Sequence, residues 1–194
     1  MRIIPFAAAD TLLDGALTAE FQGDYTSVLY IDGALELDGP FLAALGARID
    51  LAGVELVAVA GDLTVAGPIE LYQYHPSLYV GGFTRAETLE GGDCEIVVGD
   101  GAFTYLVYGY YNDGILRTGA VEVPWVINSD HDLDVDAPAA RFVDNFGVDE
   151  DADYDARSIA GAFLPELLDP DGASLNVGSF LARLRAGGPV LRDT

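Results

Sequence analysis

Apolar residues occupy every second position in two segments of the chain, 27–40 and 54–68, and each alternation runs through a central glycine. Because successive side chains of a strand point to opposite sides, this pattern predicts half-buried strands with polar residues such as Glu36 and Asp62 in water. The two segments match at a constant offset of 28 residues, which pairs Leu29 with Val57, Ile31 with Val59, Gly33 with Gly61, Leu35 with Leu63 and Leu37 with Val65.

Looser copies of this unit follow at 77–92, 94–109 and 114–129, with a shorter one at 131–135. A unit of about twenty residues with two short strands bent at glycine is typical of stacked coils. We therefore predict a mainly β fold, a right-handed parallel β-helix whose coils span residues 27–136. The glycines taken as equivalent are Gly33, Gly61, Gly82, Gly101 and Gly119.

An antiparallel β-sandwich is the alternative fold, because it also uses short alternating strands separated by turn residues. The turn at 112–114, Asn-Asp-Gly, would suit a hairpin, and Pro124 suits an edge or a corner. The glycine at the centre of each unit favours the solenoid, since hairpins would place glycine at the ends of the strands.

An N-terminal segment, 1–26, precedes the coils, and a C-terminal region, 137–194, follows them. The C-terminal region begins with an acidic loop at 143–156. Apolar residues then recur at four-residue intervals in 156–170 and in 176–192, which predicts two short amphipathic helices. We expect these helices to pack on the β-helix or to cap it, because the ends of a solenoid expose apolar residues.

Local signals mark the ends of the two predicted helices. Asn176 or Ser179 can cap the second helix at its start, and Gly187 followed by Pro189 ends it. Pro165 is expected to break the first helix, because proline has no backbone N–H to donate.

A resemblance to known proteins lies in three stretches, "LYVGGFTRAETLEGG", "IVVGDGAFTYLVYGYYNDGIL" and "VINSDHDLDV". Through them, the chain resembles a family of uncharacterised bacterial β-helical proteins related to bactofilins. The "YGYYNDG" corner is the most recognisable element, and the resemblance extends from Val28 to Val135. Bactofilins are polymer-forming cytoskeletal proteins, so the resemblance implies a right-handed β-helical core that assembles end to end without nucleotide. The chain departs from that pattern in its long C-terminal region, which bactofilins replace with disordered tails.

The charge of the chain is strongly negative: 32 acidic residues stand against nine basic ones, for a net charge of −23. All nine basic residues are arginine. Such a surface repels the phosphates of nucleic acids, so no nucleic-acid partner is expected. The acidity serves solubility or attracts a basic protein partner by electrostatic steering. The sequence contains no apolar run of about 18 residues, so no membrane partner is expected either.

Cys94 is the only cysteine of the 194 residues, which excludes an intramolecular disulfide and a cysteine-based zinc cluster. Asp10 and Asp14 interrupt the stretch that a signal peptide would keep uncharged, so we interpret the N-terminus as a mature one. Both observations predict a reducing, cytoplasmic location.

The tyrosines Tyr108, Tyr110 and Tyr111 are the first candidate binding residues. On a regular strand, Tyr108 and Tyr110 point to one side and Tyr111 to the other, so a single platform requires the following turn to twist the chain. Two interpretations stay open. The rings form a patch for a carbohydrate or peptide, or they stack on residues of adjacent coils such as Tyr79 or Trp125.

Asp130, His131 and Asp132 are the other candidate binding residues, in a stretch where aspartates alternate up to Asp136. An extended strand would project these carboxylates on one face, where they could attract Ca²⁺. The glycine that a calcium loop requires is replaced by Val135, so no metal site is predicted.

Catalytic signatures are missing from the sequence. It has two histidines, no G-x-S-x-G motif and no P-loop. Neighbouring residues of a strand face opposite ways, so Ser129, Asp130 and His131 make a poor triad. No catalytic residue and no cofactor are predicted, and the chain is not expected to be an enzyme.

These observations predict a non-catalytic acidic β-solenoid that acts through protein–protein contacts, such as an immunity protein that neutralises a basic toxin. One alternative is a self-assembling, bactofilin-like scaffold, which would form homo-oligomers. The other is a calcium-dependent carbohydrate-binding protein or lyase.

Overall fold

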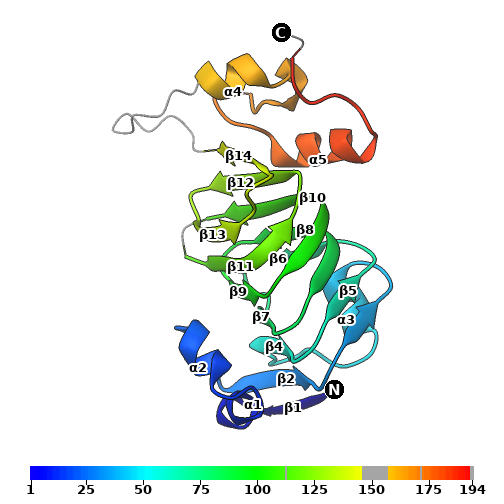
Figure 1. Cartoon of the computed structure of the whole chain (residues 1–194), viewed down its shortest axis with the longest axis vertical. Coiled ribbons are helices and arrows are strands. Elements are labelled where there is room, and N and C mark those ends of the chain that lie inside the picture. Colours follow the sequence, from blue (N-terminus) through cyan, green and yellow to red (C-terminus); the bar gives the residue numbers. More distant parts are fainter. Residues whose placement is uncertain (112, 146–156, 171, 193–194) are drawn as a thin grey trace.

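Strands from successive turns of the chain pair in parallel and build a β-solenoid of about five turns, followed by a few short helices (Figure 1). The computed structural model describes residues 1–111, 113–145, 157–170 and 172–192. All strand pairs within the solenoid are parallel among these residues, and one antiparallel strand lies at its N-terminal end. The fold is therefore the predicted solenoid and not the antiparallel sandwich.

The solenoid has three faces, each a stack of parallel strands. The first face consists of β2 (Ser27–Ile31), β4 (Leu56–Val59), β7 (Ser77–Val80), β9 (Glu95–Val98), β11 (Ile115–Glu122) and β13 (Asp132–Asp136). The second face consists of β3 (Leu35–Leu37), β5 (Leu63–Val65), the first residues of β8 (Thr84–Gly91) and β10 (Gly101–Tyr110), and the end of β11. The third face consists of β6 (Ile69–Leu71), the last residues of β8 and β10, β12 (Trp125–Ser129) and β14 (Arg141–Asp144).

The third face was not predicted, because the sequence pattern indicates only two strands per coil. Strand β8 bends and contributes to two faces, as does β10, whose register with β8 shifts between Phe103 and Leu106. Such an irregularity turns the chain without a glycine, so no glycine in the sequence marks this corner.

The first coil is longer than the others because a helix replaces its third strand. Val28 pairs with Leu56, and Leu35 with Leu63, which confirms the predicted offset of 28 residues on two faces. After β3, the chain forms α3 (Phe41–Gly46), and Phe41 and Leu45 pack into the interior. Later coils pair at shorter offsets, such as Leu78 with Ile96.

Glycines stack at the corner between the first and second faces. A Cβ on Gly61 would lie 2.7 Å from the backbone carbon of Gly33, and one on Gly82 would lie 2.5 Å from that of Gly61. The backbone N–H of Gly119 donates to the carbonyl oxygen of Gly99. The column therefore continues through Gly99, which corrects the predicted use of Gly101. Gly101 instead pairs with Thr84 inside the second face.

The interior of the coils is a continuous stack of aliphatic side chains. The predicted inward residues of the first two coils are all buried, including Leu29, Val57 and Leu63. Each such side chain contributes about 1.5–3 kcal/mol by burial before the entropy of ordering is subtracted. The predicted outward residues Glu36 and Asp62 are exposed.

The N-terminal segment covers one end and one side of the solenoid. Strand β1 (Arg2–Pro5) pairs antiparallel with β2 and so occupies its edge. Helices α1 (Phe6–Leu12) and α2 (Ala16–Glu20) lie on the outer side of the first face, where they bury Val28, Tyr30, Leu56 and Ala58. Strands β2 and β4 are consequently buried on both sides and not half-buried as the alternation predicted.

The coils extend past the predicted boundary at residue 136, because β14 still pairs with β12. Phe142 of this last strand is 55% exposed. Residues 143–145 of the predicted acidic loop belong to the end of this coil, and residues 146–156 lie outside the described part of the chain.

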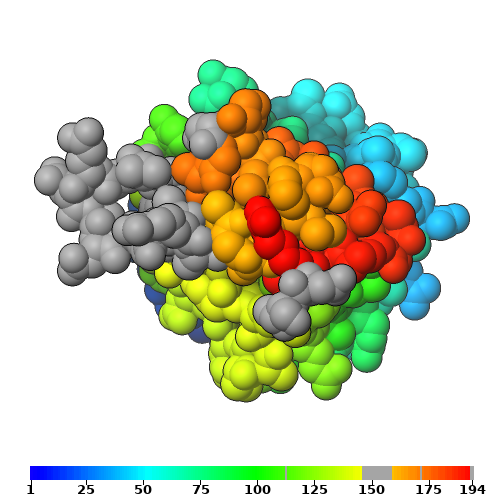
Figure 2. All heavy atoms as spheres, turned by 90° about the horizontal axis from the view of Figure 1, so that it is seen from above, coloured from blue at the N-terminus to red at the C-terminus, as the bar shows by residue number. Residues whose placement is uncertain are grey.

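The C-terminal region packs on the outer side of the third face. It contains α4 (Arg157–Ala162), a 3₁₀ turn η1 (Pro165–Leu167) and α5 (Val177–Arg185). The Asn176 side chain accepts a hydrogen bond from the Ser179 backbone N–H, so Asn176 is the cap, and Gly187 has a left-handed φ of 68° just beyond α5. The first helix ends before Pro165, as predicted. Seen along the long axis in Figure 2, this region leaves part of the last coil uncovered.

The helices of the described residues are all too short or too polar to cross a lipid bilayer.

Candidate functional site

A pocket of about 830 Å³ lies between the third face and the C-terminal region. One wall is the outer side of the coils and the other is the start of α5 with the loop before it. The lining residues are Tyr72, Gln73, Glu90, Gly92, Asp93, Tyr108, Tyr110, Tyr111, Ser129, Asn145, Asp169, Ser174, Leu175, Asn176, Val177, Gly178 and Leu181. A volume of this size is typical of sites that hold a small molecule or part of a peptide.

An aromatic cluster holds the second wall in place. The ring of Trp125 lies 5.1 Å from that of Phe180 and 5.9 Å from that of Phe163, centre to centre. Leu106 and Ile127 of the third face are buried in the same cluster. The outward side chains of β10 and β12 are therefore apolar where the C-terminal region covers them.

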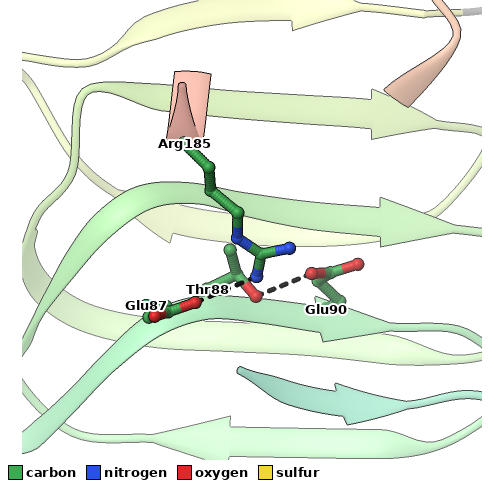
Figure 3. A network of polar contacts seen from close by, with 4 residues as sticks. All are labelled: Glu87, Thr88, Glu90 and Arg185. Atoms are coloured by element: carbon green, nitrogen blue, oxygen red, sulfur yellow. Dashed lines mark hydrogen bonds and ion pairs between the residues drawn. The ribbon is translucent and has the colours of Figure 1, made fainter. Parts of the chain in front are cut away.

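Polar contacts complete the attachment of the C-terminal region to the coils. Asn145, at the end of the last coil, accepts a hydrogen bond from the Leu175 N–H at 2.6 Å and donates to the Leu175 carbonyl at 3.0 Å. On the other side, Arg185 of α5 donates to Glu87 at 3.0 Å, as Figure 3 shows. The guanidinium carbon of Arg185 also lies 5.9 Å from the centre of the Tyr105 ring.

The three predicted tyrosines come together at the pocket. The ring of Tyr110 lies 6.1 Å from that of Tyr108 and 6.2 Å from that of Tyr111. Tyr108 is buried, whereas Tyr110 and Tyr111 are each 49% exposed. Tyr111 has a left-handed φ of 76°, and this twist of the chain lets the third ring join the other two. Such a conformation is uncommon for a bulky residue, and backbone strain of this kind clusters at functional sites.

The alternative interpretation of these rings, packing on residues of adjacent coils, describes Tyr108, which is buried in one cluster with Trp125 and Ile127. Trp125 packs on Phe163 and Phe180, and Tyr79 packs near Phe21 on the first face. At the pocket, the ring of Tyr110 contacts those of both Tyr108 and Tyr111.

Glu90 is a buried carboxylate in the pocket wall, only 5% exposed. The hydroxyl of Thr88 donates to one of its oxygens at 2.6 Å, and the hydroxyl of Tyr72 donates to the other at 2.5 Å. Burial and then the charge of Glu90 raise the pKa of Tyr72, so this hydroxyl stays protonated and remains a donor at neutral pH. Burial, and next the same charge, raise the pKa of the neighbouring Glu70 carboxyl.

The residues Asp130, His131 and Asp132 do not line the pocket, although His131 contacts Tyr111 behind it. The His131 ring is buried between coils, where Gly109 and Gly114 leave room for it, and its Nδ1 lies 2.6 Å from the carbonyl oxygen of Tyr111. Asp130 and Asp132 are exposed and do not line the pocket. The structure thus brings His131 against the backbone of Tyr111, but of the two groups of candidate residues only the tyrosines line the pocket.

Aspartates of β13 project outward on one side of the strand, as the alternation predicted. Within the described residues, no three histidine, cysteine, aspartate or glutamate side chains are placed to hold a metal ion together.

Sequence reasoning missed Glu90, although the chain carries a signal for it. Glu70, Glu90, Tyr108 and Ile127 pair with one another in successive coils, so they form one outward column on the third face. This column becomes visible in the sequence only when the third strand of each coil is recognised.

The chemistry of the pocket is that of hydrogen-bond acceptors and aromatic faces. Its described lining includes the carboxylates of Glu90, Asp93 and Asp169 and contains no arginine, histidine or cysteine. Such a lining suits a ligand that is positively charged or rich in donors.

Comparisons of the chain with protein-family models, with curated proteins and with solved structures give no match.

Proposed function

We propose that this chain is a non-catalytic binding protein whose acidic surface recognises a basic protein, as an immunity protein does when it neutralises a basic toxin. The observation that carries the proposal is the outward-facing pocket with three carboxylates and a cluster of tyrosines in its wall. Tyrosine is enriched at protein interfaces, and a net charge of −23 steers a basic partner toward the surface.

A cytoplasmic location accompanies this proposal. The Cys94 thiol is buried and donates to the carbonyl oxygens of Tyr72 and His75, each at 3.1 Å. Burial raises the pKa of Cys94 to about 11, so the reactive thiolate is scarce at neutral pH. A structural, reduced thiol of this kind suits the cytoplasm.

The test begins with capture of proteins on the immobilised chain and continues with reconstitution of the complex from the purified partner. The proposal predicts a partner of net positive charge that binds at a fixed stoichiometry. Calorimetry should show affinity falling at least about tenfold between about 50 and about 300 mM salt, because screening weakens attraction between exposed charges. If that partner is a toxin, its co-expression with this chain should restore growth.

An acidic or neutral partner, or a complex whose affinity does not respond to salt, would contradict the proposal. Lysozyme or another unrelated basic protein serves as the matched control, since general attraction between opposite charges would bind it equally well.

A self-assembling scaffold is the second candidate, favoured by the end of the last coil. Strands β13 and β14 each pair with a single neighbour among the described residues, and Phe142 is largely exposed there. At the opposite end, the antiparallel β1 interrupts the parallel stacking that simple head-to-tail growth would continue. Light scattering over a wide concentration range separates the candidates: the scaffold predicts growth into large species, and the binding protein predicts a constant mass.

A further inference from the structure

We propose that the pocket receives an arginine side chain of the basic partner, with Glu90 as its counter-charge and the tyrosine cluster as its aromatic support. This inference rests on the proposed function and assigns the partner's contact to one site. The pocket is open to the outside, since two of its tyrosines are half exposed, while Glu90 lies buried in its wall.

Glu90 lacks a charged partner within the described residues. Its two bonds come from the neutral hydroxyls of Tyr72 and Thr88. A buried carboxylate is costly unless a cation compensates it, and each carboxylate oxygen can accept more than one hydrogen bond. The planar guanidinium group can donate to both oxygens of a carboxylate at once, which an ammonium group cannot match.

The tyrosine rings supply the second half of such a site. A guanidinium group stacks favourably on an aromatic face, and the attraction grows when water is excluded. Tyr108 and Tyr110 lie on the same side of β10, and the left-handed turn at Tyr111 adds a third ring beside them. Tyr108 pairs directly with Glu90 of the neighbouring coil, so ring and carboxylate are adjacent.

The chain itself contains an example of this arrangement on the same two strands. Arg185 reaches from α5 to Glu87 and lies over the ring of Tyr105 (Figure 3). Glu90 and Tyr108 stand three residues further along β8 and β10 than Glu87 and Tyr105. Glu87 and Tyr105 lie where the register of β8 and β10 shifts, and Arg185 contacts both. Glu90 and Tyr108 are a strand pair without an arginine among the described residues.

The experiment uses Nα-acetylarginine amide as the probe and the full chain labelled with ¹³C in its tyrosine rings. The inference predicts saturable NMR shifts of the Tyr108, Tyr110 and Tyr111 rings, assigned with single Tyr→Phe variants. The uncharged isostere Nα-acetylcitrulline amide should bind at least about tenfold more weakly. Glu90→Gln should also weaken arginine binding about tenfold or more, while its thermal unfolding stays near that of the wild type. Glu36→Gln, which removes the same charge from an exposed site on the second face, should change nothing.

Equal binding of the arginine and citrulline probes, or full affinity in the Glu90→Gln variant, would overturn the inference. Shifts caused by a neutral oligosaccharide in place of arginine would also overturn it and identify a carbohydrate site. A basic partner that binds wild type and Glu90→Gln equally would refute the pocket assignment alone and leave the proposed function standing. Saturable arginine binding without any basic partner would refute the proposed function and leave the pocket assignment standing.

Discussion

The outer sides of the first and third faces are both covered by a terminal region of the chain, but the two covers differ in their chemistry. On the first face, α1, α2 and the residue after α2 place Ala9, Leu17 and Phe21 against strands that are apolar on both sides. On the third face, the C-terminal region meets an apolar area around Trp125 and then parts from the coils to leave the polar pocket.

The difference follows from the outward residues of the strands beneath. The first face presents Val28, Tyr30 and Leu56, which gain stability from complete burial. The third face presents an outward column that changes from Glu70 and Glu90 to apolar residues in later coils. Burial of a carboxylate is costly, and Glu90, which is buried in the pocket wall, accepts hydrogen bonds from Tyr72 and Thr88 that offset part of this cost. The same solenoid thus supports one structural cover and one cover that shapes a site.

The largest effect is expected from breaking the interior that both covers share. Leu63→Asp should unfold the protein, because it places an unpaired charge in the apolar stack. Circular dichroism should show loss of the β signal at room temperature. The matched control Glu36→Lys changes an exposed residue on the same face and should retain the fold. Equal tolerance of both changes would contradict the assignment of the inner and outer sides.

A large effect confined to one cover is expected from Phe180→Ala. Loss of this buried ring should cost about 3–5 kcal/mol of stability and loosen the C-terminal region and the pocket. Leu17→Ala should cost about 2–5 kcal/mol on the first face and leave the pocket unchanged. Hydrogen exchange checks both: faster exchange should concentrate in α5 for the first variant and in α1 and α2 for the second.

A smaller effect is expected from Asn145→Ala, which removes the bonds to Leu175. The buried N–H and carbonyl of Leu175 would lose their partner, at a cost of about 1–3 kcal/mol. Chemical denaturation measures the loss, and hydrogen exchange should locate it at residues 174–178. An unchanged midpoint would show that Asn145 does not hold the pocket wall.

The smallest effects are expected from pH, with opposite signs on the two faces. The Thr26 and Ser27 N–H groups donate to Glu55 near the N-terminal cover and lower its pKa below the ordinary value of about 4.5. A lowered pKa means that the carboxylate stabilises the fold above its ordinary pKa and loses this contribution as the pH falls. The melting-temperature advantage of wild type over Glu55→Gln should therefore be constant at neutral pH and shrink below about pH 4.5.

Glu70 at the third face should behave in the opposite way, because burial and Glu90 raise its pKa. A raised pKa means that the ionised form destabilises the fold at neutral pH and that protonation relieves this cost as the pH falls. Glu70→Gln should therefore melt slightly higher than wild type at pH 7, and the difference should disappear in acid. The same sign for both variants would contradict the electrostatic contrast between the faces.

The stacking of the coils could be predicted from the sequence because two copies share a regular alternation. This alternation predicts that Leu29 pairs with Val57 and Leu35 with Leu63, and the structure contains both pairs. The third face could not be predicted in the same way, because the bends in β8 and β10 contain no glycine. Tyr108, Tyr110 and Tyr111 could be predicted as candidate binding residues because they lie close together in the sequence.

The remainder of the pocket depends on contacts between distant segments. Asn145 meets Leu175 only after the C-terminal region has folded onto the third face, and no periodicity relates the two. The burial of His131 depends likewise on the space that Gly109 and Gly114 leave between coils. Local patterns carry no information on either arrangement.

The most direct test of the account is hydrogen exchange of the full chain with and without the purified basic partner that we propose. The account predicts protection at the pocket, in residues 72–75, 108–111 and 174–178, with α1 and α2 unaffected. Protection confined to β13, β14 or β1 would contradict it, because the partner would then contact the ends of the solenoid and not the pocket of the third face.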